Sequence, residues 1–167
     1  MKNIYLVGFM GTGKTTAGKI LADRLKRKFI EMDEVIEKEE KKSIPEIFAK
    51  KGEQHFRTLE NNLLKKISKE TDLVVSCGGG LICNQENLKI LKESGVVFNL
   101  TAKPKEIYER TKKYTNRPLL NVNNPEEKIE ELVKKRNPYY SKAHHTIDTS
   151  AISALEVAEK IIGLLNG

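Results

Sequence analysis

The stretch that decides the fold is Gly8-Phe-Met-Gly-Thr-Gly-Lys14-Thr15, near the start of a chain of 167 residues. It matches the pattern G-x-x-x-x-G-K-[ST], in which glycines let the backbone wrap around a phosphate group. Residues 3–7 form a short apolar run typical of a buried strand, and residues 15–25 have the apolar spacing of a helix. A strand before the motif and a helix after it favour nucleotide binding, and the alternative is a loop that binds no ligand.

Each part of this loop has a predicted role toward ATP. The backbone N–H groups of residues 11–16, together with the positive end of the following helix, are expected to cradle the β-phosphate. Lys14 is expected to bridge the β- and γ-phosphate oxygens, and Thr15 to bind Mg²⁺ through its hydroxyl oxygen. The predicted ATP-binding residues of the loop are Gly11, Thr12, Gly13, Lys14, Thr15 and Thr16.

Farther along the chain, apolar runs alternate with helical patterns. Strands are predicted at residues 29–33, 73–76, 96–100 and 146–148, and helices at 53–68 and 86–93 and from residues 43, 104, 125 and 153. This alternation predicts an α/β fold of three αβα layers with a central parallel sheet of five strands. Ligands of such sheets bind beyond the carboxyl ends of the strands, which is where the motifs fall.

Length and composition predict a single domain covering residues 1–167. Charged residues make up 32% and hydrophobic residues 38% of the chain, as in soluble globular proteins. Cys77 and Cys83 lack the spacing of a metal site, and no apolar run is long enough to cross a membrane, so we expect a cytoplasmic protein with free thiols. The net charge is +7, but the basic residues are interspersed with acidic ones, which argues against a nucleic-acid partner.

Carboxylates and glycines follow two of the predicted strands. Glu31 and Asp33 share parity in the predicted strand 29–33, so both are expected to point the same way, toward a metal ion or an acceptor hydroxyl. The alternative for both Glu31 and Asp33 is an exposed strand end that caps the next helix. The glycine triplet at 78–80 allows backbone N–H groups to approach a ligand, or is a plain flexible turn. Ser76, just before the triplet, could reach the water shell of the metal.

Arginine is scarce in this chain, because only six of the 30 basic residues are Arg. Where Lys is the usual surface cation, an Arg is more typical of a site that needs its planar, bidentate fork. Arg57 and Arg136, each in a predicted helix, are interpreted either as surface cations or as a clamp for a carboxylate. Arg117 lies in the polar segment 114–124, and it either neutralises charge on a transferring phosphoryl group or is simply solvated.

The ordered set of motifs resembles the shikimate kinase family over nearly the whole chain, from Gly8 to the last helix. Phe29-x-x-x-Asp33 with Ile36-Glu37 is similar to the family's F-x-D-x-D-x-x-I-E, and Phe56-Arg57 with Glu60 is similar to its F-R-x-x-E. The glycine triplet, Arg117-Pro-Leu-Leu120 and Arg136-x-x-x-Tyr140 follow in the family's order. Glu31 departs from this pattern, because the family usually has Asp there, so its part in binding Mg²⁺, direct or through water, stays open.

The resemblance implies that ATP phosphorylates the 3-hydroxyl of shikimate, giving ADP and shikimate 3-phosphate on the way to chorismate and the aromatic amino acids. It implies that Asp33 holds the 3-hydroxyl or acts as its base, that Arg110 and residues 149–152 contact adenine, and that Arg117 belongs to a mobile lid at about 112–124. We expect a monomer that requires Mg²⁺. The predicted catalytic residues are Lys14, Asp33 and Arg117, and the predicted substrate-binding residues are Asp33, Arg57, Gly78, Gly79, Gly80 and Arg136.

Two alternatives remain at this stage. Another P-loop kinase of small metabolites, of the gluconate or nucleoside type, shares the loop and the fold, because a fold does not determine its substrate. A nucleotide-binding module without catalysis would bind ATP but no acceptor. The glycine triplet with Asp33 argues against the module, and two arginines converging on one carboxylate would argue against the other kinases.

Overall fold

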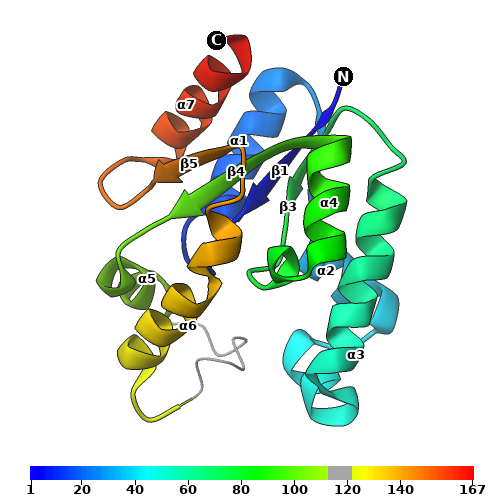
Figure 1. The fold of residues 1–167 in the computed structure, drawn as a ribbon, viewed down its shortest axis with the longest axis vertical. Helices are drawn as coiled ribbons and strands as arrows, with labels where there is room; N and C mark the ends of the chain where they lie inside the picture. The colour runs from blue at the N-terminus through cyan, green and yellow to red at the C-terminus, as the bar shows by residue number, and fades with distance from the viewer. Residues whose placement is uncertain (113–121) are drawn as a thin grey trace.

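A computed structural model describes residues 1–112 and 122–167, and its centre is a parallel sheet (Figure 1). The strands are β1 (Asn3–Val7), β2 (Lys28–Glu31), β3 (Leu73–Ser76), β4 (Gly95–Thr101) and β5 (His145–Asp148). They are arranged in the order β2-β3-β1-β4-β5, and every neighbouring pair is parallel. The predicted five-stranded parallel sheet is confirmed.

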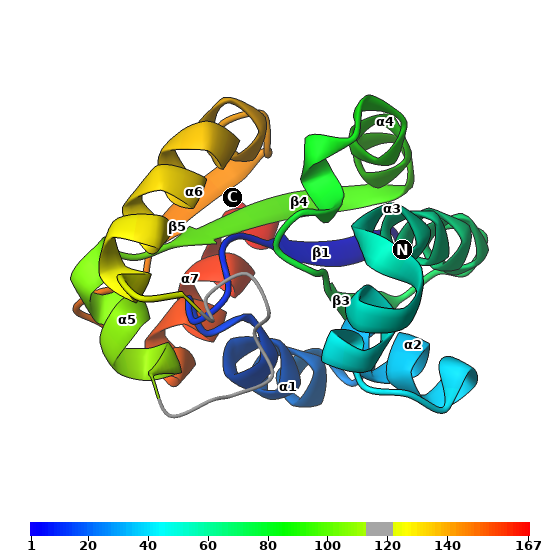
Figure 2. The same ribbon diagram turned by 90° about the horizontal axis from the view of Figure 1, so that it is seen from below.

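Helices connect the strands and cover both faces of the sheet. They are α1 (Lys14–Leu25), α2 (Met32–Glu40), α3 (Ile44–Ile67), α4 (Gln85–Ser94), α5 (Pro104–Thr111), α6 (Pro125–Tyr140) and α7 (Ala154–Asn166), with a short 3-10 helix η1 at Leu81–Cys83. Figure 2 shows α4 and α6 on one side of the sheet and α1 and α7 on the other. The three-layer αβα architecture is therefore confirmed.

The alternation of side chains along β1 explains these layers. All five residues of β1 are buried, as expected for a central parallel strand that is covered on both faces. Tyr5 and Val7 pack into the core formed with α3, α4 and α6, whereas Ile4 and Leu6 pack into the core formed with α1 and α7. This two-sided burial holds the start of the phosphate loop, which follows Val7, in a rigid setting.

Two serines begin helices as the sequence predicts. The Ser43 hydroxyl accepts a hydrogen bond from the Glu46 N–H at 3.3 Å, and the Ser153 hydroxyl accepts one from the Glu156 N–H at 3.1 Å. Both are capping boxes, in which each serine contributes about 1 kcal/mol to helix stability. The two helices predicted on either side of Gly52 lie within α3, and the break between them is where predicted, because the Gly52 backbone is non-helical with φ 85° and ψ 167°.

The prediction for the end of the second strand is wrong. β2 ends at Glu31, and Asp33 lies in the first turn of α2 rather than in the strand. Met32 is fully buried and begins the helix, and the acidic side chains of Asp33 and Glu34 are favoured there by the helix dipole. Shared parity along a strand is therefore not what brings Glu31 and Asp33 to the same place.

Candidate active site

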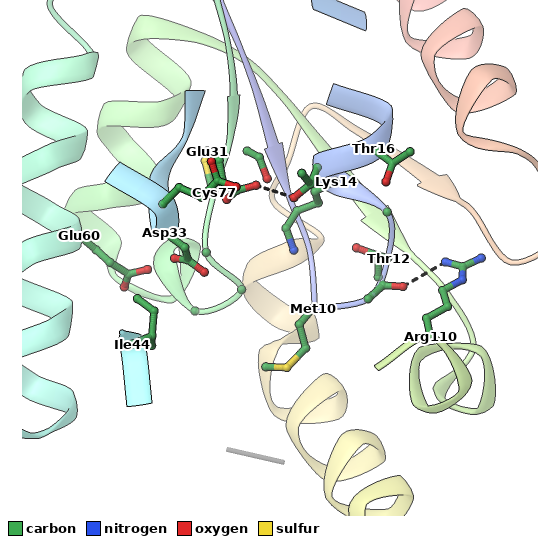
Figure 3. A pocket seen from close by; sticks show the side chains of 18 of the residues that line it. Met10, Thr12, Lys14, Thr16, Glu31, Asp33, Ile44, Glu60, Cys77 and Arg110 are labelled. Atoms are coloured by element: carbon green, nitrogen blue, oxygen red, sulfur yellow. Dashed lines mark hydrogen bonds between the residues drawn. The ribbon is translucent and has the colours of Figure 1, made fainter. Parts of the chain in front are cut away.

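A cleft of about 790 Å³ opens at the carboxyl ends of the strands. It is lined by the phosphate loop, by the ends of β2 and β3, and by residues of α2, α3, α5 and α6. Figure 3 shows Asp33 and Glu60 at one end of this cleft and Arg110 at the other, with Lys14 between them. The described residues of the predicted site that line it are Gly11, Thr12, Gly13, Lys14, Thr15, Thr16, Glu31, Asp33, Arg57, Ser76, Gly78, Gly79, Gly80, Arg110 and Arg136.

The phosphate loop is held in shape by its own residues. A Cβ on Gly8 would lie 2.1 Å from the carbonyl oxygen of Leu100, so only glycine fits at this crossing of the loop and β4. The Thr12 hydroxyl donates to the Phe9 carbonyl at 2.7 Å. The Lys14 ammonium donates to the carbonyl oxygens of Gly8 at 2.6 Å and Phe9 at 3.0 Å. The loop is thus formed in advance of ligand, with a buried cation across its mouth.

Oxygen atoms suited to a hard cation gather beside the loop. The Thr15 hydroxyl donates to Glu31 Oε2 at 2.5 Å, and Glu31 pairs in register with Ser76 on the neighbouring strand. Burial raises the pKa of the Glu31 carboxyl above its ordinary value, and the hydrogen bond from Thr15 opposes this rise. Hydroxyl and carboxylate oxygens fit Mg²⁺, which protein sites typically hold through one or two side chains together with phosphate oxygens and water.

Within residues 1–112 and 122–167, no group of three or more His, Cys, Asp or Glu side chains is arranged to hold a metal ion. Mg²⁺ beside Thr15 would take further oxygen ligands from phosphate groups and water, as it commonly does in proteins.

Arg57 is held on α3 by two carboxylates. Its Nη1 donates to Glu60 Oε1 at 2.7 Å, and its Nη2 donates to Glu53 Oε2 at 3.1 Å. Glu60 is only 1% exposed, and burial raises its pKa to about 7, although the Arg57 charge and hydrogen bond act in the opposite direction. Sequence reasoning used Glu60 only as part of a motif and missed Glu53. Their spacing of three and four residues from Arg57 on one helix could have indicated both contacts.

The glycine triplet lies against the charged side chains of the cleft. A Cβ on Gly78 would come within 2.5 Å of Glu60 Oε2 and 3.2 Å of Asp33 Oδ1. A Cβ on Gly80 would lie 2.7 Å from Arg57 Nη2. Any larger side chain at these positions would displace the charged groups, so the triplet is a close approach of backbone to side chains rather than a plain flexible turn.

Arg136 reaches the same triplet from α6. It is 8% exposed, and its guanidinium lies over the Phe9 ring at 5.4 Å from the ring centroid. Its Nη1 would be 3.2 Å from a Cβ on Gly79, and among the described residues this atom has no hydrogen-bond partner. The Tyr140 hydroxyl, one helical turn later, donates to the Gly79 carbonyl at 2.6 Å. Arg57 and Arg136, 79 positions apart in the sequence, therefore converge on neighbouring glycines.

The other two predicted arginines have different outcomes. Arg110, predicted to contact adenine, lines the cleft and hydrogen-bonds to Gly11 and to Thr149. Arg117 and most of the predicted lid lie outside the described residues. The predicted roles of both arginines toward ATP stay predictions.

Comparison with known proteins identifies the family to which this cleft belongs. A sequence model described as "SKI: Shikimate kinase" matches residues 10–166. The chain belongs to the shikimate kinase family. A shikimate kinase from Thermodesulfovibrio yellowstonii is 52% identical over 97% of this chain and 94% of its own length. One from Pelotomaculum thermopropionicum is 47% identical over 99% of this chain and 96% of its own length.

A solved structure supports the same assignment. The structure of shikimate kinase from Acinetobacter baumannii in complex with shikimate matches with a TM-score of 0.96 and 43% sequence identity. The match covers 99% of this chain and 93% of that one. Membership of the family makes this chain a P-loop kinase. In the part of the chain that the structure describes, no helix has the length and apolar character needed to span a bilayer.

Proposed function

We propose that this chain transfers the γ-phosphate of ATP to the 3-hydroxyl of shikimate, giving shikimate 3-phosphate and ADP. The observation that carries the proposal is the convergence of Arg57 and Arg136 on the glycine triplet, beside a complete phosphate loop. An acceptor that bears a carboxylate and several hydroxyls fits such a site. The two arginines can bind the carboxylate, and other polar groups of the cleft can hydrogen-bond to the hydroxyls. A chain of the shikimate kinase family supplies both in one cleft.

On the nucleotide side, Lys14 and the loop N–H groups are proposed to bind the β- and γ-phosphates. When bound, Mg²⁺ neutralises phosphate charge, and Thr15 and Glu31 are the side chains placed to hold it, Glu31 directly or through water shared with Ser76. Binding of phosphates draws the Lys14 ammonium away from the loop carbonyls that it contacts in this structure. Lys14 then stabilises the charge that develops on the phosphate oxygens during transfer.

On the acceptor side, Asp33 is proposed to accept a hydrogen bond from the 3-hydroxyl. The hydroxyl oxygen attacks the γ-phosphorus, the bond from that phosphorus to the bridging oxygen breaks, and the proton leaves toward Asp33. Arg57 and Arg136 bind the carboxylate and orient the sugar-like ring. Since phosphoryl transfer proceeds through a loose transition state, positioning by these groups contributes more than proton removal by Asp33.

The proposed lid at about 112–124 follows directly from α5, whose last turn carries Arg110 at the edge of the cleft. Arg117 of this segment is proposed to reach the transferring phosphate and to help exclude water. Support comes from the position of the segment between two helices, α5 and α6, that both contribute residues to the cleft.

The state of the protein in the cell is also proposed. The proposed active unit is a single-domain monomer, because the described residues of one chain bring the phosphate loop, Asp33, Arg57 and Arg136 to the same cleft. The reaction consumes ATP, and both cysteines are free thiols, which supports a cytoplasmic location. Light scattering coupled to size-exclusion chromatography tests the monomer, since a stable dimer at assay concentrations would contradict it.

The decisive experiment is an ADP-release assay with shikimate and Mg-ATP. We expect turnover well above the ATPase background. In the NMR spectrum of the product, coupling of ³¹P to the proton on carbon 3 should show that the phosphate is on the 3-hydroxyl. Lys14→Met serves as the inactive control. Gluconate and nucleosides, tested under the same conditions, represent the other kinase classes. Turnover with one of these and none with shikimate would overturn the substrate, and no turnover with any acceptor would favour a binding module.

A further inference from the structure

We propose that Arg110 and Thr149 form a clamp that orients the donor groups of the phosphate loop, separately from any contact with adenine. Both are positioning residues, because they act through the backbone of residues 11–13. The proposal rests on the nucleotide half of the proposed function. It is independent of the identity of the acceptor.

Arg110 connects α5 to the outer side of the loop. Its Nη1 donates to the Gly11 carbonyl at 3.1 Å and to the Thr149 hydroxyl at 3.1 Å, and its Nη2 donates to the Thr149 carbonyl at 2.9 Å. Figure 3 shows the Arg110 side chain extending toward Thr12. The next residue of α5 packs on the same loop position, since a Cβ on Gly11 would lie 2.6 Å from Thr111 Cγ2. A planar guanidinium can make these three bonds at once, which a lysine ammonium cannot do in the same geometry.

Thr149 completes the clamp from the end of β5. Its N–H donates to the Thr101 carbonyl at 2.8 Å, which extends the pairing of β4 and β5 by one residue. Its hydroxyl has two carbonyl acceptors within reach, Thr12 at 2.9 Å and Thr101 at 3.1 Å, while it accepts from Arg110. Thr149 is 3% exposed, so these buried bonds lie largely out of contact with water.

The planarity of the peptide bond turns these contacts into an orientation of the loop. In a trans peptide, the carbonyl and the N–H of one peptide unit point in opposite directions. Because Arg110 holds the Gly11 carbonyl, the Thr12 N–H points away from α5. Because Thr149 holds the Thr12 carbonyl, the Gly13 N–H points away from β5. Two successive donors are thus directed away from the clamp, as an anion-binding nest requires.

Such restraint matters here because the loop backbone is permissive. Gly11 and Gly13 have φ angles of 79° and 93°, a region in which glycine has no steric penalty. The φ preferences of these two glycines would therefore offer little resistance to rotation of either peptide unit. The contacts from α5 and β5 supply the resistance, and they place the N–H groups before phosphate arrives.

The test measures affinity for inorganic pyrophosphate, which lacks adenine, beside affinity for ADP, by isothermal titration calorimetry. Thr149→Val removes the hydroxyl with little change of shape, and Arg110→Lys keeps the charge but loses the fork. We expect each variant to lower the affinity for pyrophosphate and for ADP by about tenfold, which is the usual cost of leaving a buried carbonyl without its donor. Thr149→Ser keeps the hydroxyl and should restore wild-type affinity for both ligands.

A matched control is Lys105→Ala, which removes an exposed cation of α5 that lies outside the cleft. It should leave both affinities unchanged, whereas a similar loss there would mean that general charge, not the clamp, is at work. If the Thr149 and Arg110 variants bind ADP more weakly but bind pyrophosphate with unaltered affinity, the two residues act on adenine alone and the proposal is overturned. Because no acceptor is present, absence of turnover with shikimate would leave this result intact and would reject only the substrate.

Discussion

The two halves of the cleft are built in different ways. The nucleotide half is one contiguous stretch, Gly8 to Thr15, whose backbone and Lys14 form the binding surface between β1 and α1. The acceptor half combines charged side chains from α2, α3 and α6 around the glycine triplet after β3. Local sequence determines which residues form the phosphate loop of the first half, while the second half exists only when distant elements pack together.

The difference also concerns what each half uses for recognition. The phosphate loop relies on backbone N–H groups and a helix terminus, which recognise any phosphate. The acceptor half relies on the half-buried Arg57 and on the buried Glu60 and Arg136, for which a charge without its partner is costly. Changes in the nucleotide half should therefore affect turnover with every acceptor, and changes in the acceptor half should affect affinity for one.

The largest expected effect is that of Lys14→Met. Removing the ammonium should lower kcat by about 10³-fold, because the group stabilises charge that develops only in the transition state. The coupled assay measures the rate, and a thermal melt checks that the variant is folded. A folded variant that keeps a tenth or more of wild-type kcat would show that the loop N–H groups suffice without Lys14.

The next effect separates the halves most clearly. Arg57→Ala and Arg136→Ala should each raise the KM for shikimate by about 100-fold, with a smaller change in the KM for ATP. Arg24→Ala, which removes an exposed arginine of α1, is the control and should change neither value. An unaltered KM for shikimate in both variants would reject the carboxylate clamp.

A pH effect should belong to the acceptor half alone. Burial raises the pKa of Glu60 to about 7, and a substrate carboxylate on Arg57 favours the protonated form of Glu60. About half of Glu60 is protonated at pH 7 and about a tenth at pH 8, so the KM for shikimate should rise about fivefold over this interval, and Glu60→Gln should flatten this profile. Glu53→Gln, which changes the more exposed partner of Arg57, should keep the wild-type profile.

The same group makes a prediction about folding. A carboxyl whose pKa is raised in the folded state stabilises that state fully below its unfolded value of 4.5, and this contribution is lost as the pH rises through about 7. Urea denaturation from pH 5 to pH 8 should show a smaller decline in the free energy of unfolding for Glu60→Gln than for the wild type. Parallel declines in the two proteins would contradict the assignment to Glu60.

The smallest effect tests the side chain that departs from the family pattern. Glu31→Asp shortens the carboxylate that accepts from Thr15 at 2.5 Å, so direct contact between the two is lost. The Mg²⁺ concentration for half-maximal rate should rise about threefold, since the net contribution of one hydrogen bond is roughly 0.5–1.5 kcal/mol. Glu34→Asp removes a methylene from a neighbouring glutamate and is the control, so it should leave the Mg²⁺ dependence unchanged. An unaltered Mg²⁺ dependence would make Glu31 a bystander.

Particular residues show where sequence reasoning succeeded and where it failed. Thr15 and the strand-loop-helix order were predictable because the spacing of apolar residues reports local structure. The end of β2 was not predictable, because α2 begins at the buried Met32, two residues earlier than the apolar pattern suggests. Asp33 still lies in the cleft, because the first turn of α2 places it there. The contact of Tyr140 with Gly79, in contrast, required the packed structure.

By itself, the sequence determined the αβα class, the phosphate loop and, through resemblance, the family. These depend on interactions between residues close in the chain and on an ordered set of motifs. Only the tertiary structure decided that Arg57 and Arg136 meet at one glycine triplet, and that Arg110 and Thr149 hold the carbonyls of the phosphate loop. The physical reason is that burial and hydrogen bonding between distant residues arise from packing, which no local pattern encodes.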